Sequence, residues 1–346
     1  MILGSSESEE RQKERRFVSA EDVARLAGVS RSAVSRTFTP GASVAPLTRD
    51  KVMRAAEHLG YQVNDLARAV LNNHSRLVGI VATNPELGFR AHLAAALAKA
   101  LIQRGSIPIL INTGQTEEEL LAAQKTLIGH RAEATIILSG STPKNFVDLA
   151  HRNGQSVVAI GRSEPGADQV RVGNADAAAK AAQIFVGRGH RLLGIAGSHS
   201  GTPSITEREA SFIQAGKALG AAVVVANGQN TDYAGGLEAA RELLCRPDRP
   251  EAVFCVNDQI AFGLMDFARS ELGLSIPNDL AVIGFDDVPE AGWLSYRLTT
   301  FRQDPVLMAR QAVDLIDRRF ANPDAAPFTA SVVPELVTRL SAASAT

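Results

Sequence analysis

The sequence predicts a chain of two unlike parts: a short all-α head, followed by an α/β body of two doubly wound parallel-sheet lobes. In residues 17–62, apolar side chains recur at helical spacing in short segments joined by tight turns. From residue 77 onward, short apolar runs alternate with helical patterns, which is typical of parallel sheets with helices on both faces. The alternation comes as two successive series of similar size, so we expect two lobes with a cleft between them.

The first segment of the chain is strongly polar. Residues 1–16 are too polar for a signal peptide, so we expect a disordered leader there. No apolar stretch reaches the roughly 18 residues that a membrane helix needs, and we therefore expect no membrane partner. Cys255 lies in an apolar run and should be a buried free thiol, which favours a reducing, cytoplasmic location.

A first helix is predicted directly after the leader. Ser19 and Asp22 have the three-residue spacing of an N-terminal capping box. The helix should then turn a small apolar face inward, made of Val23, Ala24, Leu26 and Ala27. Gly28 suits the tight corner that follows.

A second helix is predicted over residues 31–38, with Ser30 as its N-cap. A third helix, over residues 48–59, can close the pair into a small core. The inward-facing residues of the second helix should be Ala33, Val34 and Phe38, and its exposed residues Arg31, Ser32, Ser35 and Arg36. Basic and hydroxyl groups at the exposed end of a short helix suit the reading of base edges in a major groove, as in a helix-turn-helix. An ordinary helical hairpin with a solvated polar face is the alternative.

Charge is distributed unevenly along the chain. The net charge is −1, so no overall field attracts nucleic acid. Between Arg11 and Arg76, however, twelve Lys and Arg stand against six Asp and Glu, a local charge of +6. This asymmetry is typical of a DNA-binding head on a neutral-to-acidic body.

In the body, apolar runs predict strands near residues 77–83, 107–111, 134–138, 157–160, 192–196, 223–226, 252–256, 280–283, 298–302 and 331–334. In such sheets, ligands bind outside the carboxyl ends of the strands. Asn257 follows one strand end and should point into the cleft, and Asp286 and Asp287 follow another. We expect one of the two aspartates to bind ligand hydroxyls and the other to hold the loop. Asp258 is well placed to cap a helix over residues 259–272.

The stretch DVARLAGVSRSAVSRTF, followed by AAEHLGY and NDLARA, resembles the N-terminal module of lactose-repressor-type (LacI/GalR) transcriptional regulators. Body motifs such as FCVNDQIAFG, VIGFDDVP and LTTFRQD match the same family, so the resemblance covers almost the whole chain. It implies a body similar to periplasmic sugar-binding proteins. The chain should then cross between the lobes near residues 174, 287 and 304–325.

These observations predict the following organisation: leader 1–16, helix-turn-helix DNA-binding domain 17–62, hinge helix or linker 63–76, and effector-binding and dimerisation domain 77–346, with an N-lobe of about 77–173 plus 287–303 and a C-lobe of about 174–286 plus 304–335.

The resemblance assigns base readout to Arg31, Ser32 and Arg36, and phosphate contacts to Ser30, Ser35 and Tyr61. It also implies a hinge helix that orders on DNA, pairs with its dimer mate and inserts an apolar side chain into the minor groove. The expected hinge contacts are Asn64, Ala67, Arg68 and Val70. This chain has Val70 where the family usually has leucine, and Val63 where it usually has proline. A plain flexible tether is the alternative.

For the effector site, the resemblance points to Arg208, expected in the first turn of a helix over residues 206–219, together with Asn257 and Asp286. An arginine and carboxylates can hold adjacent hydroxyls through paired hydrogen bonds. Phe89 can stack on a sugar face, and Arg90 would bring a positive charge into the cleft. We therefore expect a sugar or sugar acid, and a more positive wall favours an anionic effector such as a sugar acid or a phosphorylated sugar.

The predicted function is a sequence-specific transcriptional regulator, a repressor by preference, that binds a near-palindromic operator as a homodimer. Effector binding would change lobe closure and hinge pairing. Whether it releases or promotes DNA binding, and whether the assembly is a dimer or a tetramer, stays open.

Two other classes of protein are the alternatives to a transcriptional regulator. An enzyme on an α/β scaffold lacks GxGxxG, GxxxxGK[ST] and GxSxG motifs and metal-spaced histidines, so we expect no catalytic residue, no metal site and no cofactor. A periplasmic-type solute-binding protein without enzymatic activity would suit the body but not the head.

Overall fold

The structure is a computed structural model that describes residues 17–39, 41–63, 75–114, 116–138, 145–161 and 163–342. The chain divides into two compact units, residues 1–75 and residues 76–346, and each is described by itself. The predicted leader 1–16 and most of the predicted hinge lie outside the described residues.

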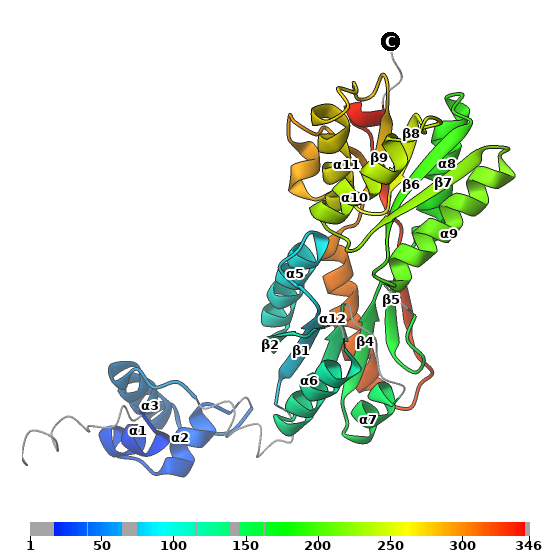
Figure 1. The fold of residues 1–346 in the computed structure, drawn as a ribbon. Coiled ribbons are helices and arrows are strands. Elements are labelled where there is room, and N and C mark those ends of the chain that lie inside the picture. Colours follow the sequence, from blue (N-terminus) through cyan, green and yellow to red (C-terminus); the bar gives the residue numbers. More distant parts are fainter. Residues whose placement is uncertain are drawn as a thin grey trace, which may run out of the picture. The chain divides into compact units, whose positions relative to one another are not determined.

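The described head consists of the helices α1 (Ala20–Ala27), α2 (Arg31–Thr37) and α3 (Pro46–Leu59) (Figure 1). The predicted capping box is confirmed, because Ser19 accepts from the Asp22 backbone and Asp22 from the Ser19 backbone. Gly28 has a φ of 66°, a left-handed conformation that ends α1 at little cost for glycine. Ser30 caps α2, as predicted, by accepting from the backbone of Ala33.

The hydrophobic core of the head is small, and α1, α2 and α3 all contribute residues to it. Val23, Val34 and Val52, one from each helix, are fully buried. Phe38 packs on Tyr61 with ring centroids 5.6 Å apart. The prediction that Leu26 faces inward is wrong, since 51% of its surface is exposed. The buried side of α1 is filled by Val23 and its neighbours, and Leu26 points away from it.

The body contains two sheets (Figure 1). The first has the order β11-β5-β4-β3-β1-β2, and its paired strands are parallel. Its strands are β1 (Leu77–Ala82), β2 (Ile107–Asn112), β3 (Ala134–Ile137), β4 (Ser156–Ile160), β5 (Asp168–Val172) and β11 (Thr329–Val332).

The second sheet has the order β12-β10-β9-β8-β6-β7, with β12 antiparallel to β10 and the other pairs parallel. Its strands are β6 (Leu192–Ser198), β7 (Ala222–Gly228), β8 (Ala252–Cys255), β9 (Ala281–Asp286), β10 (Thr299–Arg302) and β12 (Glu335–Val337). We call the part of the body around the first sheet the first lobe and the part around the second sheet the second lobe. The predicted doubly wound architecture is confirmed in both.

Helices cover the sheets on both faces. In the first lobe, α5 (Phe89–Arg104) and α12 (Pro305–Ala321) pack together, while α6 (Glu117–Gly129) and α7 (Phe146–Arg152) form the other layer. In the second lobe the pairs are α8 (Asn174–Gly187) with α9 (Pro203–Ala218), and α10 (Tyr233–Leu244) with α11 (Asp258–Ser270). Short 3-10 helices, η1 (Pro289–Gly292) and η2 (Leu340–Ala342), complete the second lobe. All residues of β1 are buried, as expected for a strand covered on both faces.

Within the described residues, the chain crosses between the lobes after β5, after β10 and after β11. The first crossing, at Gly173, lies where it was predicted. The assignment of residues 287–303 to the first lobe and 304–335 to the second is wrong, as is the crossing near 287. β10 pairs with β9 in the second sheet, and β11 pairs with β5 in the first. Apolar runs predict that a strand exists, but they do not specify which sheet edge it joins.

The pair α10 and α11 approaches closely through glycine. A Cβ atom on Gly236 would lie 2.4 Å from the backbone oxygen of Ile260. We therefore expect Gly236→Ala to lower the free energy of unfolding by about 1–3 kcal/mol, because backbone cannot give way as a flexible side chain can. Urea unfolding of the purified protein measures this change.

The matched control is Gly187→Ala at the exposed end of α8, where an added Cβ meets no described atom within 4 Å. This variant should be unchanged or more stable by up to about 1 kcal/mol. Equal stability of the two variants would contradict the close packing of α10 on α11.

Candidate functional site

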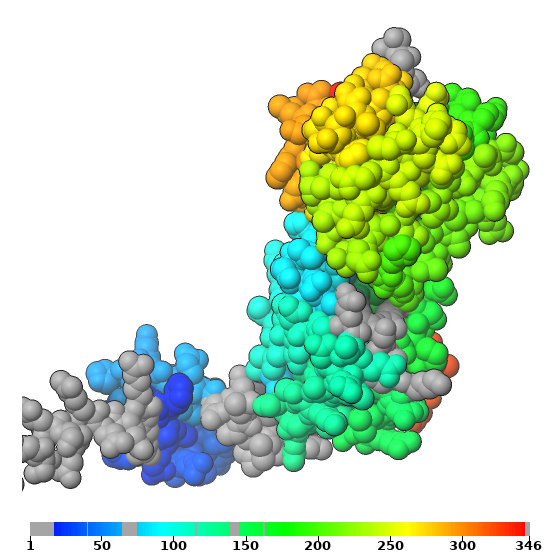
Figure 2. Space-filling model, in the orientation of Figure 1, coloured from blue at the N-terminus to red at the C-terminus, as the bar shows by residue number. Residues whose placement is uncertain are grey.

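A cavity of about 330 Å³ lies in the body between the two lobes. Figure 2 shows the lobes as two masses, the second green to orange and the first cyan to green, that meet at a narrower neck. The lining residues follow strand ends of both sheets, for example Thr83 and Gly161 from the first and Asn257 and Asp286 from the second. This is the place where parallel α/β sheets bind ligands. The volume is at the small end of the range for ligand pockets.

The structure brings all five predicted effector residues to this cavity. The lining includes Phe89, Arg90, Arg208, Asn257 and Asp286. The first two come from the start of α5 in the first lobe, and the other three come from the second lobe. Their roles toward a ligand stay predictions.

Arg208 is held rigidly although it is almost fully buried, with 4% of its surface exposed. Its Nε donates to Asn174 Oδ1 at 2.8 Å and its Nη1 to the Val256 carbonyl at 2.8 Å. The guanidinium lies over the ring of Phe285, 3.4 Å from its centroid. Burial lowers the pKa of Arg208 to about 10, against the opposing effect of the nearby Asp286 carboxylate. The side chain therefore stays a cation at neutral pH.

Arg208 lies in the second turn of α9, so its predicted place in the first turn is wrong. The helix starts at Pro203, three residues before the predicted start at residue 206. Proline suits the first helical position, because its fixed φ is helical and its missing N–H would have no partner there. The long loop expected before the helix is correspondingly shorter.

Asp286, the last residue of β9, and Asp287, which follows it, make different contacts. Asp286 accepts a hydrogen bond from Gln303 Nε2 at 2.6 Å and lies 3.8 Å from Arg208 Nη1. Burial raises its pKa to about 6, and Arg208 counteracts the rise. Asp287 instead binds Arg302 at 2.6 Å and Arg339 at 2.7 Å, outside the cavity lining. Asp286 thus faces the cavity while Asp287 holds the loop.

Asn257, and not Asp258, caps α11, so the capping prediction for Asp258 is wrong. The Asn257 Oδ1 accepts from the Ile260 backbone at 2.8 Å, because the chain enters the helix one residue earlier than expected. Asp258 is fully buried and accepts from the Val288 backbone at 3.0 Å and from Thr300 Oγ1 at 2.6 Å. Burial raises the pKa of Asp258, and the nearby Asp286 carboxylate adds to the rise. Asp258 therefore connects the start of α11 to β10 and to the segment that follows β9.

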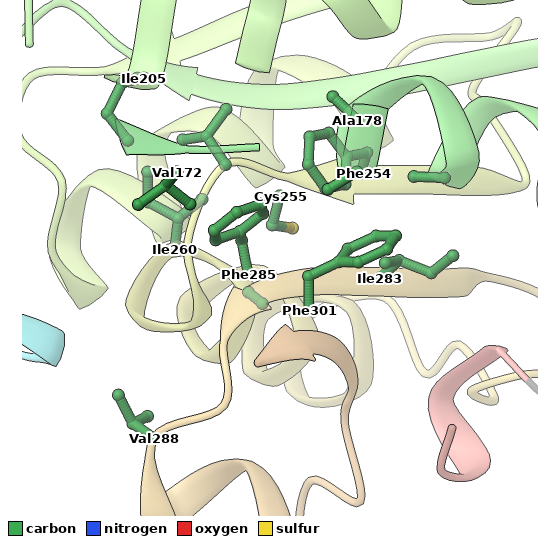
Figure 3. Packing of buried hydrophobic residues seen from close by; sticks show 14 of the residues in the cluster. Val172, Ala178, Ile205, Phe254, Cys255, Ile260, Ile283, Phe285, Val288 and Phe301 are labelled. Atoms are coloured by element: carbon green, nitrogen blue, oxygen red, sulfur yellow. The ribbon is translucent and has the colours of Figure 1, made fainter. Parts of the chain in front are cut away.

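An aromatic core supports this wall of the cavity. Figure 3 shows Phe285 beside Cys255 and Phe254, with Ile283 on the same strand, β9, and Phe301 on the adjacent strand, β10. The ring centroids of Phe285 and Phe301 are 5.9 Å apart. Cys255 is a buried free thiol, as predicted, and burial raises its pKa well above the ordinary value. The packing keeps Phe285 in place under the Arg208 guanidinium.

Arg90 is the cation of the first-lobe wall. It lies in the first turn of α5, and its Nη1 donates to the Thr83 carbonyl at 2.6 Å. Burial lowers the pKa of Arg90, while the carboxylates of Asp286 and Glu86 counteract the change. Phe89, half-buried beside it, provides an apolar surface in the same lining.

Several lining residues had not been singled out from the sequence. Gln303 lies in the lining and holds Asp286, whereas Asn174 lies outside the lining and holds Arg208. Gln303 is part of the motif LTTFRQD of the family resemblance, so the motif marked the place but not the role. Gln259 and Thr83 also line the cavity. Gln259 lies within the motif FCVNDQIAFG, but neither residue had been assigned a place in the site.

The head presents a polar helix face. The exposed residues of α2 and its cap are Ser30, Arg31, Ser32, Ser35 and Arg36, and Tyr61 is half-buried. Ser30 Oγ lies 2.9 Å from Ser32 Oγ, and Arg36 Nε donates to the Ser32 carbonyl at 3.4 Å. The predicted hinge contacts Asn64, Ala67, Arg68 and Val70 lie outside the described residues.

The described part of the chain contains no group of three or more His, Cys, Asp or Glu placed to hold a metal ion. None of its helices is long and apolar enough to cross a membrane.

Comparison with known families gives two matches. Residues 20–64 match the family described as "Bacterial regulatory proteins, lacI family", and residues 182–342 match the family described as "Periplasmic binding protein-like domain". The first match covers the head, and the second covers most of the second lobe together with α12 and β11.

Similar proteins extend over nearly the whole chain. The "Ribose operon repressor" of Escherichia coli is 29% identical over 339 residues, covering 93% of this chain and 98% of its own length. The "HTH-type transcriptional repressor PurR" of Mannheimia succiniciproducens is 28% identical over 328 residues, covering 92% of this chain and 97% of its own.

Solved structures show the same fold. A complex of the transcriptional regulator CelR with cellobiose has a TM-score of 0.69 at 28% identity, covering 94% of this chain and 99% of the other. The lac repressor dimer bound to operator and the anti-inducer ONPF has a TM-score of 0.85 at 23% identity, with the same coverage.

Proposed function

The chain is a transcriptional regulator of the LacI family with a periplasmic-binding-protein-like body, and from this we propose that a small polyhydroxylated effector in the interlobe cavity controls its affinity for operator DNA. The role is that of a repressor, as in the similar proteins named above. Operator DNA lies in the cytoplasm, so the function is exercised there. The chain has no catalytic role in this proposal.

The observation that carries the proposal is the pairing of donors and acceptors on the second-lobe wall. The Asp286 carboxylate can accept from a hydroxyl while the adjacent Arg208 guanidinium, 3.8 Å away, can donate to its neighbour. Asn257 and Gln303 line the same wall with amide groups. Adjacent hydroxyls are the groups that such a wall recognises, and Phe89 provides an apolar surface opposite for a sugar ring.

Effector binding in the cavity changes the DNA affinity of the head through closure of the two lobes. The ligand would touch residues of both lobes, and it therefore favours the lobe arrangement in which all of these contacts are made. Two of the crossing segments lie side by side, since the Gly173 backbone donates to the Val332 carbonyl at 2.9 Å. They would move together, as in hinge closure of two-lobed binding proteins.

DNA recognition is assigned to α2. Arg31, Ser32 and Arg36 would contact base edges in the major groove, and Ser30, Ser35 and Tyr61 would position the head on phosphates. The linker residues Asn64, Ala67, Arg68 and Val70 would form the minor-groove contact of a hinge helix. One head reads only a few base pairs, so a homodimer on a near-palindromic operator completes the site.

Part of the subunit contact is assigned to the segment after η1. Trp293 and Leu294 are 56% and 81% exposed, a large apolar surface for a region packed firmly on α11 through Tyr296 and Phe262, whose rings are 4.3 Å apart. We expect Leu294→Asp to raise the dissociation constant of the dimer by roughly 10- to 100-fold, because it places a charge in an apolar interface. Analytical ultracentrifugation measures this constant.

Leu219→Asp at the end of α9, where the leucine is 42% exposed, is the control and should leave the dimer intact. If Leu294→Asp dimerises like wild type, the segment after η1 is not part of the contact.

The function is tested in two steps. Double-stranded DNA is first selected from a random library with the purified full chain, and an enriched near-palindromic duplex is expected. Its affinity is then measured by fluorescence anisotropy with and without a panel of sugars and sugar derivatives, and at least one should change it. Absence of any enriched duplex would contradict the regulator, and sugar binding without DNA binding would favour a solute-binding protein.

A further inference from the structure

We propose that the effector carries an oxyanion, either a carboxylate or a phosphate, and that Arg90 binds this group on the first-lobe wall. The inference rests on the proposed function, since it specifies the chemical class of the effector for the same cavity. It assigns the two walls different tasks: the second lobe recognises hydroxyls and the first lobe recognises the negative charge.

Arg90 has hydrogen-bond donors that no described residue uses. A guanidinium has five N–H groups. The described residues provide one acceptor, the Thr83 carbonyl, which Nη1 reaches at 2.6 Å. Among the described residues, no carboxylate lies within ion-pair distance of Arg90, unlike Arg104, Arg302 and Arg319. The edge formed by Nε and Nη2 is therefore left for a two-point contact of the kind that carboxylates and phosphates make.

Arg208, the other arginine of the lining, differs from Arg90 in its surroundings. It donates to Asn174 and to the Val256 carbonyl, its guanidinium lies over the ring of Phe285, and the Asp286 carboxylate lies 3.8 Å from Nη1. Its charge is thus compensated by the protein. Arg90 has no carboxylate within ion-pair distance among the described residues, and Asp286 and Glu86 act on it only from farther away. The charge of Arg90 is therefore compensated less closely than that of Arg208.

Acidic residues are unevenly distributed around the cavity. The described lining residues of the first lobe include no Asp or Glu. Those of the second lobe include Asp286, bound to Gln303, and Asp232, whose Oδ1 caps α10 through the Gly235 backbone at 2.9 Å. A ligand with its hydroxyls toward the second lobe and an oxyanion toward Arg90 therefore meets complementary groups at both ends.

The surroundings of Arg90 strengthen such a contact. The Arg90 side chain is half-buried in a lining that also contains Phe89, Leu87 and Leu93. An ion pair between Arg90 and an oxyanion is screened less there than in water. The first turn of α5 contains no acidic residue, so the positive end of the helix is not neutralised by its own side chains. An anionic effector bound to Arg90 and to the second-lobe wall would bridge the lobes and so favour closure.

The test uses matched ligand pairs on the full-length protein. Glucose is compared with gluconate and glucose 6-phosphate, and ribose with ribonate and ribose 5-phosphate, by isothermal titration calorimetry. In at least one pair an acid should bind wild type about 10- to 100-fold more tightly than the neutral sugar, as expected for a charge-assisted contact. Comparison of the two acids in each series distinguishes carboxylate from phosphate recognition.

Variants of Arg90 then locate the contact. Arg90→Gln should remove the preference for the acid, a loss of about 10- to 100-fold, with less than a threefold change for the neutral sugar. Arg90→Lys keeps the charge but not the planar fork, and should keep part of the preference. Arg310→Gln, an exposed arginine of α12 outside the lining, is the control and should bind every ligand like wild type.

The outcomes separate the two proposals. Neutral sugars that bind as tightly as the acids, or an acid preference that survives in Arg90→Gln, would overturn the oxyanion site and leave the effector function intact. If neither neutral nor acidic members bind wild type and none changes its affinity for the selected duplex, the polyhydroxylated effector itself is wrong, and the oxyanion site with it.

Discussion

Replacing Arg208 with methionine is expected to lower the free energy of unfolding of the body by about 3–5 kcal/mol and to abolish the response of DNA binding to the effector. The variant leaves the Asp286 carboxylate buried without its cation, which is among the costly changes in a protein interior. It also removes the donors to Asn174 and Val256 and the stacking on Phe285.

The loss of unfolding free energy in Arg208→Met should depend on pH, because the Asp286 carboxylate, left without its cation, would take up a proton. Its pKa is already raised to about 6 by burial, and removal of Arg208 raises it further. A carboxyl group with a raised folded pKa contributes stability below its unfolded pKa of about 3.9 and loses it as the pH rises through the folded value. The destabilisation by Arg208→Met should therefore be larger at pH 8 than at pH 5.

Urea unfolding at both pH values, followed by the fluorescence of Trp293, the single tryptophan of the chain, measures this effect. The double variant Arg208→Met with Asp286→Asn should recover part of the stability at pH 8, since the buried charge is gone. Arg310→Met serves as the control for loss of an exposed arginine. A penalty that is the same at both pH values, with no recovery in the double variant, would show that the two side chains are not energetically paired.

Replacing Arg31 and Arg36 together with alanine is expected to raise the Kd for the selected operator duplex by roughly 100-fold or more. Each arginine lies on the exposed face of α2, and an arginine that reads a base edge contributes about 1–3 kcal/mol of binding and specificity. Both heads of a dimer lose these contacts at once. Effector binding should be unchanged, because both arginines lie in the head, which is a compact unit separate from the body that contains the cavity.

Fluorescence anisotropy with the selected duplex and with a scrambled duplex, at one salt concentration, distinguishes readout from charge. The control is Lys51→Ala with Arg54→Ala, which removes two positive charges from exposed positions of α3. This control should weaken both duplexes alike and keep the specificity ratio. The assignment of α2 as the reading helix fails if the α2 variant also weakens both duplexes equally.

Local sequence signals predicted local structure well. Ser19 with Asp22 and Ser30 are caps that act within one helical turn, and each was found where its spacing placed it. The apolar runs of the body likewise became strands, of which β1, β3, β4, β8 and β9 are fully buried. All five predicted effector residues line one cavity, because parallel strands bring their carboxyl ends to the same edge whatever their separation in sequence.

The errors came from choices that the local sequence does not determine. Asn257 and Asp258 both favour a helix start, and only the backbone entering one residue earlier selects Asn257, which leaves Asp258 to the buried contacts with Val288 and Thr300. The lobe assignment failed because a short strand such as β10 can extend either of two sheets. Its pairing with β9 depends on the tertiary structure.

The final crossing also determines the order in which the protein becomes functional during translation. β11 and β12 are edge strands of different sheets and are separated by only two residues, so both lobes await the same last segment of the nascent chain. The head, a compact unit at the other end, emerges from the ribosome long before. A chain that stops before residue 329 therefore contains the complete head but lacks one edge strand of each lobe, and we expect it to lose its response to the effector.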